Sequence, residues 1–480
     1  MMAAKVISTI VQNTAAMMAG RLISRVFQFF LLIYAARELG AADFGIFSWA
    51  FALTGLVAVF MDPGLSRYSV QQLSRSQKEI PLYFGGNLVI KIVLVLAGLL
   101  ALFIISYAMG RGQQAIQAAL LLGAMAGVDS LGRCFLMVFQ AAQRMDYEAL
   151  AISAAGVLFT LIGLLALYLM PNLAVLCGAF LLGGLIRLGI SIGIYRGRYP
   201  KPTYSFNFQF LTKLLKNGFP FALTTVFVTI YYYIDTIILT AYASDEAIGY
   251  YGAAYRFVEA PLFLVASLTT ALFPAASRLY GKDKEHLREV VGQIFPKMMA
   301  LGLSVALVIS FLAEDLVALF FGEQYGPAAK VLPVLIFSGA IIMPSTVLGT
   351  TIRAINRQGI SALVTGLAAA LNIVLNLIFI PRYTIMGAAW TTLATEAFVI
   401  VVYFAMVRHY IGRILPWGAV LSVLLLGAGL GVCLYLTQAW NLWLRLATVS
   451  LLWLPLLLFT GIIEKKHLIE MFKAVLPAGR

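Results

Sequence analysis

Ten ionisable residues of this sequence lie deep inside long apolar stretches. A charge in a hydrocarbon environment is costly, so such a residue by default faces protein or water and is a candidate site. The basic members outnumber the acidic ones, and several cationic donors in low dielectric suit a multiply charged anion such as a diphosphate. The basic set is Arg21, Arg25, Lys91, Arg133, Arg187 and Arg256, and the acidic set is Asp129, Asp235, Glu259 and Glu396.

Arg21 and Arg25 are four positions apart, so they share one face of a helix. At about 1.5 Å of rise per residue, they lie roughly 6 Å apart along the axis. This spacing fits a clamp for two phosphates through bidentate guanidinium contacts. The alternative is structural, with salt bridges to other helices or with Arg21 snorkelling toward the inner surface.

Two other basic residues have an acidic neighbour at helical spacing. Arg256 and Glu259 (i, i+3) can pair, which leaves a ligand role and a structural role open for Arg256. Asp129 and Arg133 (i, i+4) can pair in the same way, and the structural pair is favoured there. Lys91 and Arg187 lie closer to the inner surface, where they can snorkel or line the mouth of an inward-open cavity.

Asp235 and Glu396 are acidic residues without a basic residue at helical spacing. Asp235 follows a run of three tyrosines, 231–233. Each carboxylate can carry a coupling proton or bind a cation, or it can pair with an arginine across a cavity. Both readings stay open, and Glu259 and Asp129 complete the set of coupling candidates.

The sequence contains no pattern typical of a metal site or of nucleotide hydrolysis. Its histidines, His286, His409 and His467, have no metal-ligand neighbours at suitable spacing. A GxxxxGK[ST] loop for ATP phosphates is absent from the sequence. We therefore expect no metal, no cofactor and no enzyme activity, and transport would draw on a gradient, a potential or downstream consumption.

The composition is that of a membrane protein. Of 480 residues, 62% are hydrophobic and 11% are charged, against roughly a quarter charged in soluble domains. This excludes a soluble enzyme and a disordered chain, and continuous apolar stretches argue against a porin-like barrel. The net charge of +14 fits basic cytoplasmic loops better than nucleic-acid binding.

The apolar stretches predict an all-α polytopic membrane protein with about fourteen spans of roughly 20 residues. The basic residues outside the spans gather mostly on one side, which predicts cytoplasmic N- and C-termini. The spans are 12–36, 45–62, 82–109, 114–142, 149–170, 173–195, 217–241, 249–275, 291–313, 329–352, 358–381, 386–408, 415–437 and 441–463.

An internal repeat indicates two lobes. Residues 13–51 align with 217–255 without a gap, and 139–150 align with 352–363. Both pairings shift a span by six, an even number, so the two copies keep one orientation. This predicts two six-helix lobes related by a pseudo-two-fold axis along the membrane normal. The expected domains are an N-lobe (1–200), a C-lobe (201–412), and two extra helices with a tail (413–480).

Two segments carry a family resemblance. LGAADFGIFSWAFALTGLVAVFMDPGLSRYSVQQLSR (39–75) and INRQGISALVTGLAAALNIVLNLIFIPRYTIMGAAWTTLATE (355–396) resemble the two halves of polysaccharide transporters. These are the O-antigen flippase branch of the multidrug/oligosaccharidyl-lipid/polysaccharide exporter superfamily. The resemblance covers roughly residues 5–410.

The resemblance implies a flippase that moves an undecaprenyl-pyrophosphate-linked oligosaccharide across the cytoplasmic membrane by alternating access. It also implies cavity arginines on the first, second and eighth helices. Arg21 or Arg25 and Arg256 fit this pattern, whereas the second helix has no arginine. The implied partners are the lipid-linked substrate, membrane lipids, and the polymerase and glycosyltransferases of the pathway, around a monomeric transport unit.

Two other functions compete with this one. A cation-coupled multidrug antiporter of the same superfamily usually has twelve helices, and the cationic interior argues against organic cations as cargo. A membrane-bound polymerase or ligase usually carries a long outer loop, whereas the longest one expected here is 314–328. We therefore expect the flippase, with the antiporter as the alternative.

Overall fold

The computed structural model describes residues 2–204, 206–415 and 417–462, although the side chains of 2–21, 23, 224, 263, 264, 266, 267, 270 and 271 fall outside the description. Helices make up the regular structure throughout these residues, and none of them forms a strand. The predicted all-α class is therefore confirmed. The helices form two compact units, Met1–Gly252 and Ala253–Arg480, which are described one at a time.

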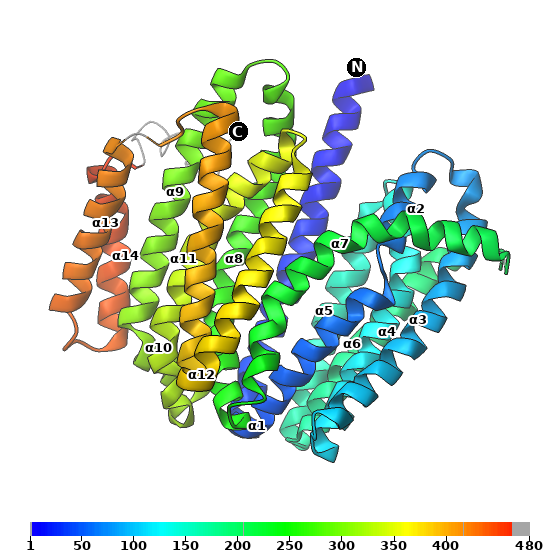
Figure 1. Cartoon of the computed structure of the whole chain (residues 1–480), viewed down its shortest axis with the longest axis horizontal. Helices are drawn as coiled ribbons and strands as arrows, with labels where there is room; N and C mark the ends of the chain where they lie inside the picture. Colours follow the sequence, from blue (N-terminus) through cyan, green and yellow to red (C-terminus); the bar gives the residue numbers. More distant parts are fainter. Residues whose placement is uncertain (1, 205, 416, 463–480) are drawn as a thin grey trace, which may run out of the picture. The chain divides into compact units, whose positions relative to one another are not determined.

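The first unit contains seven α-helices, one short 3-10 helix and the beginning of an eighth α-helix. In Figure 1, α3 and α4 of this unit lie side by side, and α5 and α6 pack next to them. The elements are α1 (Met2–Met61), α2 (Leu65–Leu73), η1 (Gln77–Glu79), α3 (Ile80–Ala108), α4 (Gln113–Ala141), α5 (Met145–Leu169), α6 (Leu173–Arg196), α7 (Phe208–Leu239) and α8 (Asp245–Tyr280).

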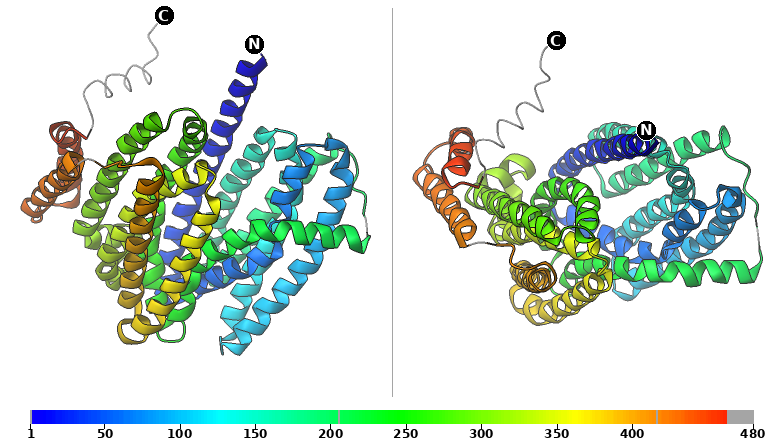
Figure 2. Two further views of the ribbon diagram at one scale, coloured as in Figure 1. Left: turned by 45° about the horizontal axis from the view of Figure 1, so that its top comes forward. Right: turned by 90° about the horizontal axis from the view of Figure 1, so that it is seen from above.

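The second unit continues from α8 and ends with a helical hairpin. Figure 2 shows this hairpin, α13 and α14, beside α9 at the edge of the unit. Arg445 of α14 anchors it by donating to the Asp315 carboxylate at 3.0 Å and to the Phe311 carbonyl at 2.8 Å. The elements are α9 (Lys284–Phe311), α10 (Ala313–Phe321), η2 (Glu323–Tyr325), α11 (Gly326–Ala354), α12 (Gln358–Ile411), α13 (Trp417–Leu436) and α14 (Leu442–Phe459).

The protein is a multi-pass membrane protein. Ten helices among the described residues are long and apolar enough to cross a membrane, and the two bent halves of α7 would make an eleventh span. Two helices hold more than one predicted span, because α1 and α12 run for 60 and 54 residues, far beyond the roughly 20 that a span needs. The number fourteen stays a prediction.

Each of these long helices contains a break. In α1 the break is Gly40, at φ 78°, a backbone conformation that glycine adopts without a steric cost. In α12 it is Thr384, at φ 49°, which is rare for a β-branched residue. Asn376 bridges the two halves of α12, donating to the Asn372 amide oxygen at 2.8 Å and accepting from the Thr391 hydroxyl.

Candidate functional site

The candidate site of the first unit is built where α1 ends. Helix α1 stops at Met61, and Asp62, Pro63 and Gly64 turn the chain into α2. Gly64 has φ 75°, and a Cβ atom there would overlap the Gly218 carbonyl oxygen of α7, so only glycine fits. The Asp62 carboxylate accepts from the Ser66 backbone N–H at 3.2 Å and from its hydroxyl at 2.7 Å, which caps the first turn of α2.

Lys91 of α3 is the buried counterion of Asp62. Its Nζ lies 3.2 Å from the carboxylate, and neither side chain has more than 4% of its surface exposed. The ammonium also donates to the Ser66 hydroxyl at 2.8 Å and to the Ser130 carbonyl of α4 at 2.9 Å. An ammonium has three N–H donors, so Lys91 is fully used within the protein and joins three helices.

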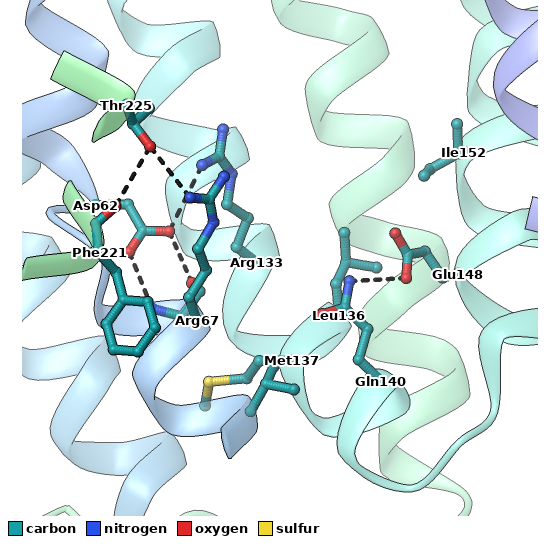
Figure 3. Close-up of a pocket in the computed structure, with 13 residues that line it drawn as sticks. Asp62, Arg67, Arg133, Leu136, Met137, Gln140, Glu148, Ile152, Phe221 and Thr225 are labelled. Carbon is teal, nitrogen blue, oxygen red and sulfur yellow. Dashed lines mark hydrogen bonds and ion pairs between the residues drawn. The ribbon is translucent and has the colours of Figure 1, made fainter. Parts of the chain in front are cut away.

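Arg133 of α4 makes a second, looser contact with the same carboxylate. Its guanidinium lies 3.6 Å from Asp62, and 56% of the Arg133 side chain is exposed. Arg67 of α2 lies nearby and donates to the Thr225 hydroxyl of α7 at 3.2 Å (Figure 3). Lys91 already balances Asp62, so Arg133 and Arg67 face only one further carboxylate in their cavity, that of Glu148, and one positive charge is left in excess.

These two arginines line a cavity of about 470 Å³. Its wall also contains Gln140 and Glu148, which bond to each other at 2.9 Å (Figure 3). A second cavity of about 140 Å³ shares Asp62 and Arg133 with the first. The larger cavity offers guanidinium, amide and hydroxyl donors together, which can hold an oxyanion and polar groups attached to it.

The predicted pairing of Asp129 with Arg133 is wrong. Asp129 forms its ion pair with Arg187 of α6, and Arg133 turns toward Asp62 instead. The spacing of four residues allowed the predicted pair, but a guanidinium from a neighbouring helix meets Asp129 directly. Arg187 is therefore partly neutralised, and Asp129 lines the smaller cavity.

Asp235 accepts hydrogen bonds from uncharged groups. It is buried, with 3% of its surface exposed, and it accepts from the Tyr251 hydroxyl of α8 and from the Thr236 backbone N–H at 2.6 Å. Donors of Tyr251 and Thr236 therefore hold this carboxylate within the first unit, and no arginine, one of the two alternatives left open by the sequence, is among the contacts described for it.

The remaining candidates are scattered. Arg25 is exposed on α1, and the side chain of Arg21 lies outside the described residues. In the second unit, Arg256 pairs with Glu259 at 2.6 Å, as the spacing predicts. Glu396 is buried in α12. The described part of the chain also holds no group of three or more metal-ligating side chains.

Sequence reasoning missed the centre of the site. Asp62 is the last residue of the predicted span 45–62, and Arg67 falls in the loop that follows it, so neither belongs to the set of deep ionisable residues. The signal was local, because an Asp–Pro–Gly turn followed by Ser66 marks a helix start capped by the aspartate. The first turn of that helix then carries Arg67 to the cavity wall.

Comparison with known proteins agrees with this architecture. Residues 10–280 match the family described as polysaccharide biosynthesis protein. The chain belongs to the polysaccharide biosynthesis protein family. Residues 220–378 of this family member also match the MatE family, which confirms the predicted superfamily.

Two curated relatives of this polysaccharide-family protein are transporters by name. One is the probable low-salt glycan biosynthesis flippase Agl15 of Haloferax volcanii, 24% identical over 76% of both chains. Another is a putative O-antigen transporter of Shigella dysenteriae, 24% identical over 67% of this chain and 80% of that one. The fold is similar to the lipid II flippase MurJ in an inward closed conformation, with a TM-score of 0.79 and 17% identity, over 96% of this chain and all of that one.

Proposed function

We propose that this protein is a flippase for a lipid-linked oligosaccharide built on undecaprenyl pyrophosphate. It would carry an O-antigen or other surface polysaccharide unit across the cytoplasmic membrane by alternating access. Family membership and the names of the relatives support the glycan cargo. The likeness to a lipid II flippase extends over 96% of the chain.

The observation that carries the proposal is the excess positive charge of the larger cavity. Arg133 and Arg67 line it together with one carboxylate, Glu148, while the Asp62 charge is already balanced by the buried Lys91, which leaves an excess of one positive charge. A pyrophosphate brings several acceptor oxygens, which planar guanidinium groups bind two at a time. Gln140 and Thr225 add neutral polar groups to the same wall.

The other residues predicted from the sequence fall into proposed substrate contacts and proposed coupling residues. Arg21, Arg25 and Arg256 stay proposed substrate contacts. Lys91 and Arg187 are the weaker candidates, since each already faces a carboxylate. Asp235, Glu396, Glu259 and Asp129 stay proposed coupling residues.

The proposed membrane topology follows from the distribution of the basic residues. Cytoplasmic N- and C-termini would place the basic loops on the inner face. The transport unit would be a monomer of two lobes, 1–200 and 201–412, with the helices of 413–480 beside them. Polymerase and glycosyltransferases of the same pathway would make and consume its substrate.

The test is flipping in proteoliposomes. An undecaprenyl-pyrophosphate oligosaccharide is supplied to one leaflet, and its appearance in the other is followed with an impermeant sugar-oxidising reagent. Wild type is compared with Arg133→Gln and Arg67→Gln, and Arg75→Gln is the matched control because Arg75 is an exposed arginine next to the end of α2. We expect at least tenfold slower flipping in the two cavity variants and wild-type rates in the control.

Two results would contradict the proposal. Flipping that survives both cavity substitutions would remove the site and keep the function. A protein that moves no lipid-linked glycan under any imposed gradient would not be a flippase of this class.

A cation-coupled antiporter is the second candidate, and two observations favour it. Residues 220–378 match the MatE family, and Asp235 is a buried carboxylate of the kind that carries a coupling ion. In the same proteoliposomes, uptake of a cationic dye driven by a proton or sodium gradient, and lost in Asp235→Asn, would establish this function.

A further inference from the structure

The first half of α7 does not run parallel to its second half. Residues 208–223 and 225–239 are bent by 52° relative to each other. Pro220 lies just before the bend, where it removes a helical hydrogen bond. In Figure 1 the first half is the green helix that runs across other helices of the first unit.

One face of this segment packs on the unit where α2 and α3 begin. Phe210 and Leu214 occupy the space over Gly86 of α3. The Asn217 amide donates to the Tyr68 hydroxyl of α2 at 3.1 Å. Positions 210, 214 and 217 follow the period of one helix face, so the segment is fixed to the ends of α2 and α3 by that face.

The rest of the helix surface carries apolar and basic side chains that the protein leaves uncovered. Phe208 is 80% exposed and Phe219 is 60% exposed. Lys213 and Lys216 are exposed between them. The loop before the helix continues the pattern, with an exposed Lys201 and with Tyr204 and Phe206 exposed at 59% and 78%.

This combination fits the interface of a membrane. Aromatic rings favour the headgroup level, and lysines beside them favour anionic lipids. The segment contacts the first turns of α2 and α3, and a headgroup layer at this level would meet its uncovered side. If this surface faced water, five large apolar side chains would be exposed in one short stretch, because Leu215 is also 37% exposed. The five are Tyr204, Phe206, Phe208, Leu215 and Phe219.

We propose that residues 201–204 and 206–219, here named the α7 arm, lie in the headgroup layer and bind anionic phospholipid headgroups. The lysines supply the charge that selects anionic lipids, and Phe208, Phe219 and Leu215 enter the acyl boundary. Helix α7 then continues from the arm to Phe221 and Thr225 in the cavity wall. Lipid bound at the arm therefore holds one wall of the cavity in place.

The test measures which lipid surrounds the arm, without any transport assay. Full-length protein carrying Phe219→Cys and Cys433→Ala is labelled with bimane, while Cys134 and Cys177 stay buried. It is placed in nanodiscs of equal parts phosphatidylglycerol and phosphatidylcholine, with bromine on the acyl chains of one lipid at a time. Bromine quenches bimane only at close range, so quenching reports the nearest lipid.

We expect brominated phosphatidylglycerol to quench the probe more than brominated phosphatidylcholine. Lys213→Gln with Lys216→Gln should remove this preference and leave quenching itself intact, since each lysine contributes about fivefold to anionic binding. Lys282→Gln with Lys284→Gln is the matched control, because both lysines are exposed elsewhere, and it should keep the preference. A bimane probe at Gly112→Cys, in the loop between α3 and α4 where a new side chain would have no atom within 4 Å, gives the quenching expected away from the arm.

Either of two outcomes would overturn the proposal. Quenching at position 219 by neither lipid would place the arm in water. Equal quenching by both lipids in wild type would place it in the membrane without headgroup selection. The reading is independent of flipping, so failure of the flippase proposal leaves it unchanged.

Discussion

The second half of α1 has two ends that are built in opposite ways. At the end near Gly40, helices touch through glycines, because a Cβ on Gly45 would overlap the Asp245 carbonyl and one on Gly249 would overlap the Ala41 carbonyl. At the other end, Asp62 gathers two cations around a cavity of about 470 Å³. One end is closed by backbone contact, and the other is hollow and charged.

The charges at the glycine end serve to close it. Arg111 donates to Asp245 at 2.6 Å and lies over the ring of Trp49 at 4.6 Å. Gln114 donates to Asp43 at 3.0 Å. Cations are matched at this end, whereas at the hollow end Arg133 exceeds what Asp62 needs. About 20 residues of helix separate the ends, roughly 30 Å, which is the thickness of a hydrocarbon core.

The difference between the two ends shows how one unit can be closed near Gly40 and open near Asp62. Close helix contact through small residues needs no charge and leaves no volume. A buried ion pair with a second cation beside it keeps volume and positive potential together. Alternating access, as proposed above, would require the first kind of end to open and the second to close around its load.

The largest effect on stability is expected for Asp62→Asn. It leaves the Lys91 ammonium buried with no exposed surface and with its carboxylate removed. Breaking a buried pair from one side costs about 3–5 kcal/mol, so the purified protein should melt at a much lower temperature. Thermal unfolding in detergent, followed by light scattering or intrinsic fluorescence, measures this.

The double variant Asp62→Asn with Lys91→Met should recover much of the loss, because it buries no unpaired charge. Asp146→Asn is the control, since that carboxylate is 46% exposed in its pair with Arg144 and exposed pairs contribute little. An Asp62→Asn protein as stable as wild type would show that Lys91 is not held as a buried cation.

The second largest loss of stability is expected for Gly249→Ala, at the end of α1 that glycine contacts close. The added methyl meets the Ala41 carbonyl, and a backbone group cannot rotate away as a side chain can. Overpacking of this kind costs about 1–3 kcal/mol, and the helices should separate. We expect lower thermal stability and faster thiol labelling of a cysteine placed at Ser48, which is 7% exposed in the wild type.

Gly178→Ala is the matched control for this prediction. Gly178 is also helical, and no atom lies within 4 Å of its added methyl. Alanine there should be neutral or stabilise the protein by up to about 1 kcal/mol. Unchanged labelling of the cysteine at Ser48 in the Gly249→Ala protein would mean that the added methyl does not separate α1 from α8.

A smaller effect is expected from the ion pair of the closed end. Arg111 and Asp245 are 13% and 32% exposed, so solvent screens part of their attraction. A double-mutant cycle of Arg111→Gln and Asp245→Asn should give a coupling of about 1 kcal/mol in thermal unfolding. A coupling near zero would leave the glycine contacts as the main closure of this end.

The helical architecture could be predicted because it depends on local hydrophobicity. Long apolar stretches fix both the class and the approximate spans. The breaks at Gly40 and Thr384 fall between predicted spans, because the chain must turn there to remain within a membrane thickness. Pro220 predicts a bend in α7, but a proline does not determine the angle, which is 52°.

The partners of buried charges could not be predicted in the same way. Spacing along one helix correctly paired Arg256 with Glu259, but for Asp129 it selected Arg133 while Arg187 of another helix makes the contact. Which helices are neighbours, and in which rotation, is set by packing over the whole unit. The Asp62 centre needs α2, α3 and α4 together, so no single segment of sequence contains it.

The smallest effect on stability should come from Arg133→Gln, and this result sharpens the comparison within the hollow end. Arg133 and Lys91 face the same carboxylate, yet Arg133 is 56% exposed and Lys91 is not exposed at all. We expect Arg133→Gln to change the free energy of unfolding by less than about 0.5 kcal/mol, whereas Lys91→Gln should lower it by about 3 kcal/mol or more. Thermal unfolding of the two variants beside wild type measures both. Equal destabilisation would make Arg133 a second structural counterion, and Arg67 would then be the remaining cation of the cavity wall, opposite the Glu148 carboxylate.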